Sequence, residues 1–482
     1  MKILDDNNII FEKKDLEIYS VMSGDYNPLH IDDEYSKATL YKESVVFGML
    51  AAEMTLKKIN LTSENIQIKF NHPIFINRKY RIEEIVLKGK RKIIIYDHSK
   101  KLLEINLEAK KIEKIDLKKV KDEEYLPMLM KARNITENDI EKTSVIGGEY
   151  IINNDEDDIL YILQKFSSYL VGMVLPGKNA LFMSCIINVI KSSAKLEKIN
   201  YRIKKQNYHT ILGLLDYYVE VYNQEEIIAL IKIQTYVRTQ FDIDENSFTQ
   251  ISNEYNEKTV LILGGTKGIG IEIAKYYIRR GSNVIITYHH SDIQAQKISE
   301  LIEPYKDRVH VIKNNIEDLK ECEKLKEYII ETYKKIDVMF LCAAQPPKYL
   351  ELNIDNYEIY QDYLIKGIKM FYYPFFSYVD IIKKNGKAVI ISSIAVEEKE
   401  ACQNMIEYLN VKMAVENMVE YAYHRENENR QYYIIRPPQM LTEMSNTPSR
   451  RINAKEPRLI FNDFIKSIEI DEDEKCIRYL NF

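Results

Sequence analysis

The chain has 482 residues, 45% of them hydrophobic and 29% charged, which is enough for about three ordinary domains of ~150 residues each. Its 68 basic and 73 acidic residues give a net charge of −5, so there is no global positive field for nucleic acid. There is no apolar run of about 18 residues, and the five scattered cysteines form no CxxC pair. The first residues lack the apolar stretch of a signal peptide, so none is expected. We therefore expect a cytoplasmic protein with no membrane span and no metal site.

The first informative stretch is Ser23-Gly24-Asp25-Tyr26-Asn27-Pro28-Leu29-His30. Gly24 and Pro28 resist both helix and strand, so the stretch predicts a loop with a carboxylate and an imidazole five residues apart. Such a pair can activate one water molecule, as base and as orienter. A helix is predicted from Gly48 to Lys58, and the free N–H groups of its first turn are suited to hold a carbonyl oxygen.

The run from Tyr19 to Ser36 resembles the signature of MaoC-like, (R)-specific enoyl-thioester hydratases of the hotdog fold. The resemblance implies that Asp25 and His30 are the catalytic pair, that Gly48 supplies a backbone N–H, and that the substrate is an acyl thioester. The family usually has His before the helix glycine, where this chain has Phe47. The alternative interpretation is an Asx-turn beside an incidental surface histidine.

Strand-like segments follow this helix, several of them alternating with period two as half-buried antiparallel strands do: residues 66–70, 80–87, 92–97 and 101–109. A long apolar helix wrapped by such strands is the hotdog arrangement, so residues 1–120 are predicted to form a MaoC-like hotdog. The segment 70–75 resembles the family's acyl-pocket lining. Within it His72 could act as an extra base, although a strand-end surface histidine is the favoured interpretation.

Residues 121–250 repeat the scheme in degraded form, after a charged segment at 110–123 that is typical of a linker. A helix is predicted over 157–171 and strands over 198–203, 211–221 and 226–234. No copy of the Asp/His motif occurs here. We therefore predict a second, degenerate hotdog that completes a double hotdog and shapes the pocket, and an unrelated α+β domain is the alternative.

From residue 256 to 482 the pattern changes to alternating strands and helices, after a polar linker predicted over 241–258. The apolar run Thr259–Leu263 is typical of a buried parallel strand, and a helix is predicted over 271–280. Between them lies Gly264-Gly265-Thr266-Lys267-Gly268-Ile269-Gly270. A glycine-rich turn in this position predicts an α/β Rossmann domain, a doubly wound parallel sheet that binds a dinucleotide pyrophosphate at the helix N-terminus.

The next predicted strand, residues 283–288, does not end in the Asp or Glu that usually binds the ribose of NAD. Its tip is Tyr288-His289-His290-Ser291, which together with Lys267 leaves room and charge for a 2′-phosphate, so we predict NADPH over NADH. The two histidines are not predicted to bind metal, because adjacent side chains are expected to point apart.

The last predicted strand of this series, residues 387–391, leads into Ser392-Ser393. Tyr408 and Lys412 follow at i and i+4, on one face of a predicted helix. An ammonium beside a phenol favours the phenolate, which makes Tyr408 a usable proton donor to a carbonyl being reduced. The Ser393 hydroxyl can hydrogen-bond the same oxygen.

Residues from about Thr259 to Met444 resemble the short-chain dehydrogenase/reductases, especially 3-oxoacyl-carrier-protein reductases. The resemblance implies that Ser393, Tyr408 and Lys412 are catalytic. It also implies these cofactor contacts: Gly264, Thr266, Lys267, Gly268, Ile269, Gly270, Asn315, Ala343, Tyr408, Lys412, Pro437 and Thr442. Two departures stand out: the family's Asn-Asn-Ala-Gly segment is Leu341-Cys342-Ala343-Ala344 here, and its catalytic Asn falls at Leu364.

The two activities are consecutive. A ketoreductase makes a 3-hydroxyacyl thioester, and a MaoC-type enzyme running backwards dehydrates it. We therefore predict a bifunctional reductase–dehydratase of fatty-acid-like or polyketide-like biosynthesis, acting on acyl-CoA or acyl carrier protein as a homodimer or larger oligomer. One alternative is catabolic hydration followed by NAD-dependent oxidation. The other is that one half is a non-catalytic module that binds acyl carriers. Basic residues near the end (Arg450, Arg451, Lys455, Arg458) could meet a phosphopantetheine, although a solvated surface is the plainer interpretation.

Overall fold

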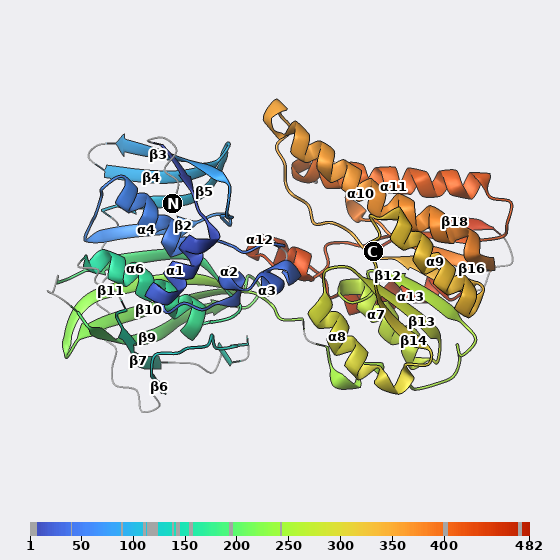
Figure 1. The fold of residues 1–482 in the computed structure, drawn as a ribbon, viewed down its shortest axis with the longest axis horizontal. Helices are drawn as coiled ribbons and strands as arrows, with labels where there is room; N and C mark the ends of the chain where they lie inside the picture. The colour runs from blue at the N-terminus through green and yellow to red at the C-terminus, as the bar shows by residue number, and fades with distance from the viewer. Residues whose placement is uncertain are drawn as a thin grey trace. The chain divides into compact units, whose positions relative to one another are not determined.

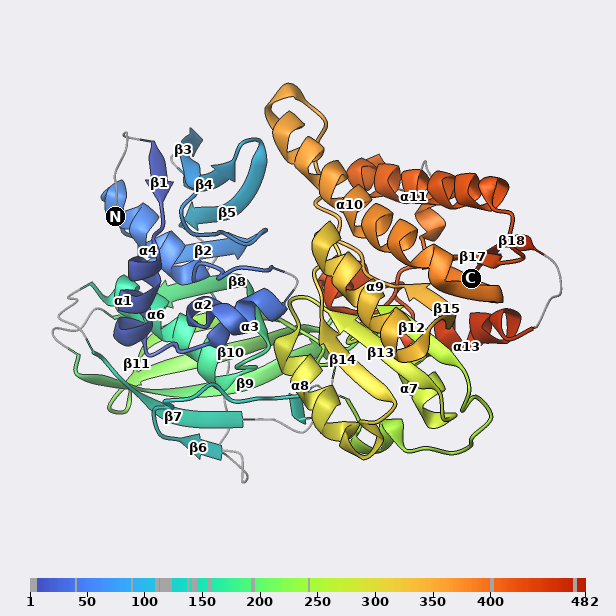
Figure 2. The same ribbon diagram turned by 45° about the vertical axis from the view of Figure 1, so that its right-hand side comes forward.

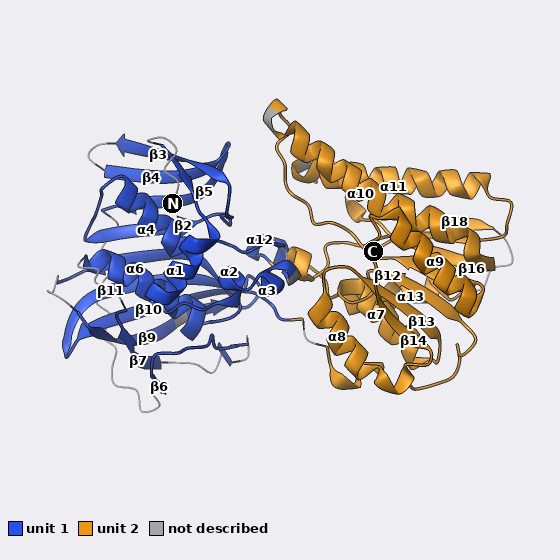
Figure 3. Ribbon diagram, in the orientation of Figure 1, with its two compact units in different colours: residues 1–240, 447–452 blue, residues 241–446, 453–482 orange. Residues whose placement is uncertain are grey.

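The computed structural model describes residues 7–39, 41–87, 90–108, 112, 124–136, 139–140, 145–153, 158–191, 196–241, 243–398, 403–470 and 475–482. The chain forms two compact units (Figure 3). Unit 1 comprises Met1–Gln240 and Thr447–Ile452, and unit 2 comprises Phe241–Asn446 and Asn453–Phe482. The predicted segments 1–120 and 121–250 lie largely in the same unit, because one sheet runs through both.

The first half of unit 1 has one central helix, α4 (Gly48–Lys58). The helix formers Met49, Leu50, Ala51 and Ala52 are all buried, so α4 is a core helix and not an amphipathic surface helix. Its other elements are β1 (Asn8–Ile10), α1 (Lys13–Ser23), α2 (Pro28–Ile31), α3 (Asp33–Ala38), β2 (Asn65–Phe70), β3 (Lys79–Leu87), β4 (Lys90–Asp97) and β5 (Lys100–Leu107).

The second half also has one central helix, α6 (Ile159–Tyr169), which is capped by Asp158 and continues as the π-helix η1 (Leu170–Val174). Every residue of α6 is buried, the polar ones included. Its other elements are β6 (Glu124–Leu126), β7 (Val145–Ile151), β8 (Ala180–Val189), β9 (Lys198–His209), β10 (Leu214–Asn223) and β11 (Glu226–Val237). The predicted helix and three strands are present, whereas β7 and β8 were not predicted as strands.

A single eleven-stranded sheet runs through unit 1, in the order β1-β3-β4-β5-β2-β8-β11-β10-β9-β7-β6. All neighbours are antiparallel except β6 and β7, which are parallel. The halves are joined where β2 pairs with β8, for example Ile68 opposite Cys185. Helices α4 and α6 lie side by side against this sheet (Figures 1 and 2) and share one hydrophobic core with it.

Unit 2 is a seven-stranded, wholly parallel sheet in the order β14-β13-β12-β15-β16-β17-β18. Alternate residues of its strands enter two separate cores, so that Ile262 packs with α7 and α13 while Leu263 packs with α9, α10 and α11. The strands are β12 (Thr259–Leu263), β13 (Asn283–Tyr288), β14 (Val309–Lys313), β15 (Ile336–Leu341), β16 (Ile382–Ile391), β17 (Gln431–Arg436) and β18 (Cys476–Asn481). The helices are α7 (Gly268–Arg279), α8 (Asp292–Leu301), α9 (Leu319–Tyr333), α10 (Tyr357–Tyr378), α11 (Ile406–Arg425) and α13 (Pro457–Ile468).

The two predicted linkers and the predicted absence of a membrane span lie outside the strands and helices described so far. The segment 241–258 is not a plain linker, because it carries the 3₁₀ turn η2 (Glu245–Phe248), and Phe248 is 1% exposed within the core of unit 2. The linker predicted over 110–123 lies outside the described residues except for Ile112. Across the described ranges, no helix combines the length and the apolar character that crossing a membrane requires.

Candidate active sites

Asp25 lies in the turn between α1 and α2, which begins at Gly24 in the left-handed conformation (φ 67°). The Asn27 side chain accepts a hydrogen bond from Leu29 N and so caps α2. The Asp25 carboxylate is buried and accepts two hydrogen bonds, from Asn27 N (3.1 Å) and from Ser168 Oγ (2.7 Å). Burial raises the pKa of Asp25 to about 7, although both hydrogen bonds favour the charged form. The carboxyl is therefore a proton donor or acceptor near neutral pH.

His30 lies in α2, and its Nδ1 is 2.7 Å from the Val45 carbonyl oxygen. Because a carbonyl only accepts, Nδ1 carries the proton and Nε2 keeps its lone pair. Burial lowers the pKa of His30 to about 4, so the imidazole is neutral at pH 7. Phe47 replaces the family's His. The centroid of its ring lies 4.0 Å from that of the His30 imidazole and 5.1 Å from that of the Tyr19 ring.

Gly48 is the first residue of α4, as predicted from the sequence, and no side chain caps this helix. The N–H groups of the first turn thus have no acceptor within the helix. A Cβ at Gly48 would stand 2.6 Å from the Phe70 ring, so only glycine lets β2 pack this closely. His72, just beyond β2, is exposed, which agrees with the favoured interpretation as a surface histidine.

In unit 2 the glycine-rich turn joins β12 to α7, as predicted. Gly264 adopts φ 81°, and a Cβ there would meet Ala343 N at 2.9 Å, so the turn is pressed against the end of β15. A Cβ at Gly270 would lie 2.3 Å from Gly264 O, which keeps α7 tight against the strand. A Cβ at Gly268 would lie 3.3 Å from Thr442 Cγ2. Two predicted cofactor contacts that are far apart in sequence are therefore neighbours.

The other predicted cofactor contacts are placed around the same edge of the sheet. Thr266 Oγ1 lies 2.6 Å from Ser291 Oγ beyond β13, Lys267 is the N-cap residue of α7, and Ile269 is buried in α7. Asn315 follows β14 and accepts from Glu317 N (3.1 Å), while the Pro437 carbonyl accepts from Ile394 N (3.1 Å).

The expectation that His289 and His290 point apart is wrong, because their ring centroids lie 3.7 Å apart, with the ring planes tilted by 33°. Both residues lie in a bend beyond β13, where the alternation of side chains along a strand no longer applies. In the part of the chain that the structure describes, no cluster of three or more His, Cys, Asp or Glu side chains is placed to hold a metal ion.

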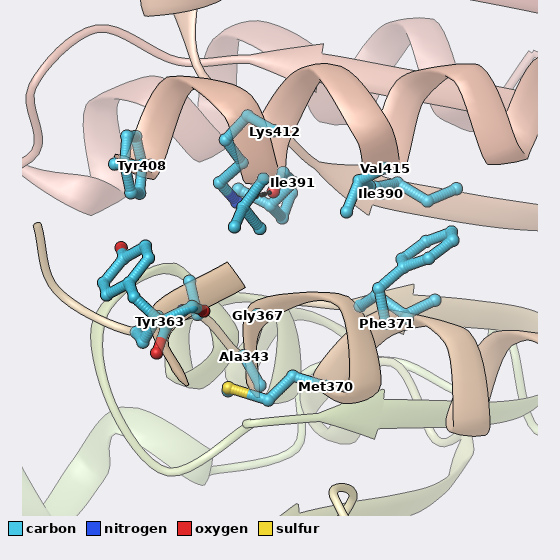
Figure 4. A pocket seen from close by; sticks show the side chains of 14 residues that line it. Ala343, Tyr363, Gly367, Met370, Phe371, Ile390, Ile391, Tyr408, Lys412 and Val415 are labelled. Atoms are coloured by element: carbon cyan, nitrogen blue, oxygen red, sulfur yellow. Dashed lines mark hydrogen bonds between the residues drawn. The ribbon is translucent and has the colours of Figure 1, made fainter. Parts of the chain in front are cut away.

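Tyr408 and Lys412 project from α11 into a pocket of about 440 Å³, including the part that is open to solvent (Figure 4). Lys412 Nζ donates to the Ile391 carbonyl (2.8 Å) and lies 5.5 Å from the centre of the Tyr408 ring. Burial lowers the pKa of Lys412 to about 8, against the opposing effect of Glu416 and Cys342. The opposite wall comes from α10 and includes Tyr363, Gly367, Met370 and Phe371.

Ser393 does not belong to the lining of this pocket. It follows β16, and its hydroxyl accepts from Ala395 N (3.3 Å), which caps the 3₁₀ turn η6 (Ile394–Val396). Leu364, at the family's Asn position, packs against the apolar core. Next to it, the Tyr363 carbonyl accepts from Gln345 Nε2 (2.6 Å), so an amide of the β15–α10 loop bonds the helix where the Asn side chain is missing.

Two family models match parts of the chain. Residues 1–101 match a MaoC like domain, and residues 258–452 match the short chain dehydrogenase family. The chain contains a MaoC-like domain and a short-chain dehydrogenase domain. The first implies a hotdog fold for the start of unit 1, and the second agrees with the parallel sheet of unit 2.

Among curated proteins, the short-chain dehydrogenase domain is 29% identical over 203 residues to the dehydrogenase/reductase SDR family protein 7-like of Dictyostelium discoideum, covering 40% of this chain and 61% of that protein. It is 33% identical over 103 residues to an L-rhamnose 1-dehydrogenase (NAD(P)(+)) of a Sphingomonas species, covering 21% of this chain and 41% of that protein. These matches thus span less than two thirds of the length of either relative.

Solved structures similar to this chain include the angucycline C-6 ketoreductase LanV with bound NADP, at 18% identity and a TM-score of 0.41. That match covers 48% of this chain and 97% of the other. An alcohol dehydrogenase from Thermococcus sibiricus, complexed with 5-hydroxy-NADP, matches at 18% identity and a TM-score of 0.41, over 47% of this chain and 95% of the other.

Sequence reasoning missed the partners that hold the first site together. Ser168 and Gly172 belong to the second half and contact Asp25 from more than 140 positions away. The only sequence signal for these contacts is the presence of polar residues in the otherwise apolar pattern of 159–174. A hydroxyl buried in a core helix needs a hydrogen-bond partner, so such a residue indicates that a partner lies nearby.

Proposed function

We propose that the chain is a bifunctional enzyme, an NADPH-dependent 3-oxoacyl-thioester reductase and an (R)-3-hydroxyacyl-thioester dehydratase, in a fatty-acid-like or polyketide-like pathway. The main observation is that the turn after α1 and the short helix α2 place the buried Asp25 and the half-buried His30 in one segment, where burial raises the pKa of Asp25 and lowers that of His30, toward acid and base roles. The Tyr408/Lys412 pocket in the same chain supplies the preceding step. Fusing the two raises the effective concentration of the intermediate.

In the dehydratase, the neutral His30 Nε2 removes the proton from the α-carbon of the 3-hydroxyacyl thioester. The electron pair forms the α,β double bond as the β-carbon–oxygen bond breaks. Asp25, in its acid form, gives its proton to the departing hydroxyl, which leaves as water. The N–H groups at the start of α4, from Gly48 on, hold the thioester oxygen as negative charge develops on it.

The reductase site fits a dinucleotide because no side chain caps the start of α7 with a hydrogen bond, and the glycine turn lies there beside Thr442. The turn from Gly264 to Gly270, with Asn315, Ala343, Pro437 and Thr442, would hold NADPH, which when bound supplies a hydride to the carbonyl carbon. Tyr408 donates the proton to the carbonyl oxygen, and the Lys412 ammonium stabilises the phenolate left behind. Lys267 and the absence of an acid at the end of β13 favour the 2′-phosphate.

The substrate is an acyl group on coenzyme A or acyl carrier protein, both of which carry it on a phosphorylated pantetheine. Arginine side chains of unit 1 support the proposal that the carrier bears a phosphate. Arg238 lies close enough to lower the pKa of His30 and donates to Tyr35 Oη (3.0 Å). Arg451, on the short helix α12 (Pro448–Arg451), donates to Thr239 Oγ1 (3.0 Å), and Arg450 lies near Lys100.

For unit 1 as a whole we propose a double hotdog. Two buried central helices, a sheet that passes from one half to the other at the β2–β8 pair, and a shared core support this fold. The second half carries no Asp/His motif, so it acts as the partner of an active first half. We further propose that the whole chain self-associates as a homodimer or larger.

The test is an assay of the purified chain with acetoacetyl-CoA and with acetoacetyl-carrier protein, each with NADPH and NADH. We expect NADPH oxidation followed by formation of the crotonyl thioester. The Asp25→Asn and His30→Ala variants should stop at the 3-hydroxy product, and Tyr408→Phe should stop at the 3-oxo substrate. Dehydration that survives in Asp25→Asn, or equal kcat/KM for the two cofactors, would contradict the proposal.

One observation favours a second candidate, in which unit 2 binds cofactor and acyl carrier without reducing. Leu364 places an apolar side chain where the family has the Asn of its proton relay. NADPH binding without NADPH oxidation by acetoacetyl thioesters would favour this candidate. A marked kcat/KM preference for NAD⁺ with (R)-3-hydroxyacyl-CoA would instead favour the catabolic direction.

A further inference from the structure

The second half of unit 1 holds the catalytic carboxylate of the first. Ser168 lies in α6 and donates to Asp25 Oδ2 across 2.7 Å. The two residues are 4% and 2% exposed, so water does not compete for this bond. A charge-assisted hydrogen bond between buried groups fixes the direction of the carboxyl.

The bond is unusual for a helical serine, whose hydroxyl commonly donates to the carbonyl four residues earlier. Its neighbour Ser167 does this, donating to Leu163 O at 2.7 Å. Ser168 donates instead across the interface between the two halves. The difference between these adjacent serines indicates that the Ser168 hydroxyl serves Asp25 and not the helix.

The π-helix η1, which follows α6, packs against the loop that carries Asp25. A Cβ at Gly172 would lie 2.1 Å from Asp25 Oδ1, so only glycine admits the carboxylate here. Asn27 Nδ2 donates to Gly177 O (3.0 Å), and Tyr26 N lies 3.2 Å from Met173 Sδ. A π-turn widens the helix locally and is frequent at functional sites. The loop is therefore held at successive positions by one segment of the other half.

We propose that Ser168 is a positioning residue of the dehydratase: its hydroxyl orients the Asp25 carboxyl toward the β-hydroxyl of the substrate. This inference rests on the proposed function and deepens it. It gives the half without an Asp/His motif a direct part in the reaction, beyond completing the sheet.

Removing the Ser168 hydroxyl withdraws a donor that favours the carboxylate, so the pKa of Asp25 should rise. The alkaline limb of dehydration, which requires the acid form, should then move to higher pH. The ionisable groups that feel the charge of Asp25 stay in place in such a variant: Tyr19 of α1 and Tyr150 of β7, both of which also feel the charge of Glu53 of α4.

The experiment compares Ser168→Ala with the matched control Ser167→Ala and with the conservative Ser168→Thr in the full chain. We expect Ser168→Ala to lower the dehydratase kcat about 10- to 100-fold, with KM for the 3-hydroxybutyryl thioester within about twofold and the alkaline limb moved upward. Ser168→Thr should restore the wild-type limb, and Ser167→Ala should match the wild type. A Ser168→Ala variant with the wild-type pH profile, or a loss equal to that of Ser167→Ala, would overturn the proposal.

A second readout does not depend on turnover. In protein labelled with ¹³C at aspartate carboxyls, the Asp25 signal is the one missing from Asp25→Asn, and its titration should shift upward in Ser168→Ala. An unchanged titration would overturn the role of Ser168. If the shift occurs while the wild type dehydrates no 3-hydroxyacyl thioester, the contact is supported and the proposed function fails.

Discussion

Lys165 on α6 and Glu53 on α4 form an ion pair of 2.9 Å that joins the central helices of the two halves of unit 1. Both side chains are buried. A second lysine, Lys57, contacts the same carboxylate at 2.9 Å but is itself half-exposed. A buried pair of this kind adds little net stability, but it resists alternative packings of the helices, since a shift between them takes the buried Lys165 ammonium away from Glu53.

Replacing Lys165 with Met should therefore destabilise unit 1 by about 3 kcal/mol, because Glu53 loses its buried partner. The double variant Glu53→Met/Lys165→Met should recover most of this loss. Lys57→Met is the matched control and should cost less than about 1 kcal/mol, as exposed pairs do. Urea unfolding followed by circular dichroism measures all three. A double variant no more stable than Lys165→Met would contradict this account.

The pH dependence of dehydration follows from the shifted pKa values of Asp25 and His30. Activity requires a neutral imidazole, which is lost below about pH 4, and an acid carboxyl, which is lost above about pH 7. Since the pair holds one proton in both directions of the reaction, hydration of crotonyl thioesters should show the same two limbs. Initial rates of both directions between pH 3.5 and about 9 test this. A hydration profile that still rises above about pH 8 would be inconsistent with it.

The raised pKa of Asp25 also lowers the free energy of unfolding at alkaline pH. Its folded-state pKa is raised above the unfolded value, so its contribution is present in acid and is lost as pH rises through about 7. Asp25→Asn should thus abolish dehydration yet raise the free energy of unfolding at pH 8 by about 1–3 kcal/mol, with little difference at pH 4. Thermal unfolding of both proteins at the two pH values measures this. A variant less stable than the wild type at pH 8 would contradict it.

The sequence identified the elements that carry continuous local patterns. The apolar run before Gly264, the buried helix that begins at Gly48 and the i, i+4 pair of Tyr408 and Lys412 each lie in a single element, and the structure places them there. Local periodicity suffices for these because each element buries its own residues. The strands β7 and β8 were missed because neither shows a simple alternation of buried and exposed positions.

Long-range contacts could not be predicted in the same way. The Ser168 bond to Asp25, the ring contact of Phe47 with His30 and the bond from Gln345 to the Tyr363 carbonyl each depend on how separate elements pack. The segment around Phe248 was predicted to be a linker from its polarity, yet one aromatic residue anchors it in the core. The average composition of a segment does not show that one of its residues, such as Phe248, is buried in the core.

Gly48→Ala should separate oxyanion binding from proton transfer. The added Cβ would stand 2.6 Å from the Phe70 ring, so β2 or the start of α4 has to move. We expect dehydration to fall about 10- to 100-fold, as when a backbone donor of this kind is displaced, while the pH limbs stay in place. Gly48→Ala/Phe70→Ala, which removes the clash, should recover part of the rate. Stopped-flow assays with 3-hydroxybutyryl thioester measure both, and an unshifted rate in the single variant would exclude Gly48 from the site.

The reductase should lose activity as Lys412 loses its proton. Because burial lowers the pKa of this ammonium to about 8, the charge that stabilises the Tyr408 phenolate is present below that pH and disappears above it. NADPH oxidation by acetoacetyl thioesters should thus decline above about pH 8. Lys412→Arg, whose charge persists, should flatten the decline even if its kcat is about 10-fold lower, whereas Lys412→Met should be nearly inactive at every pH. Steady-state kcat/KM from pH 6 to about 10 compares the three proteins. An equal decline in Lys412→Arg would assign the titration to another group.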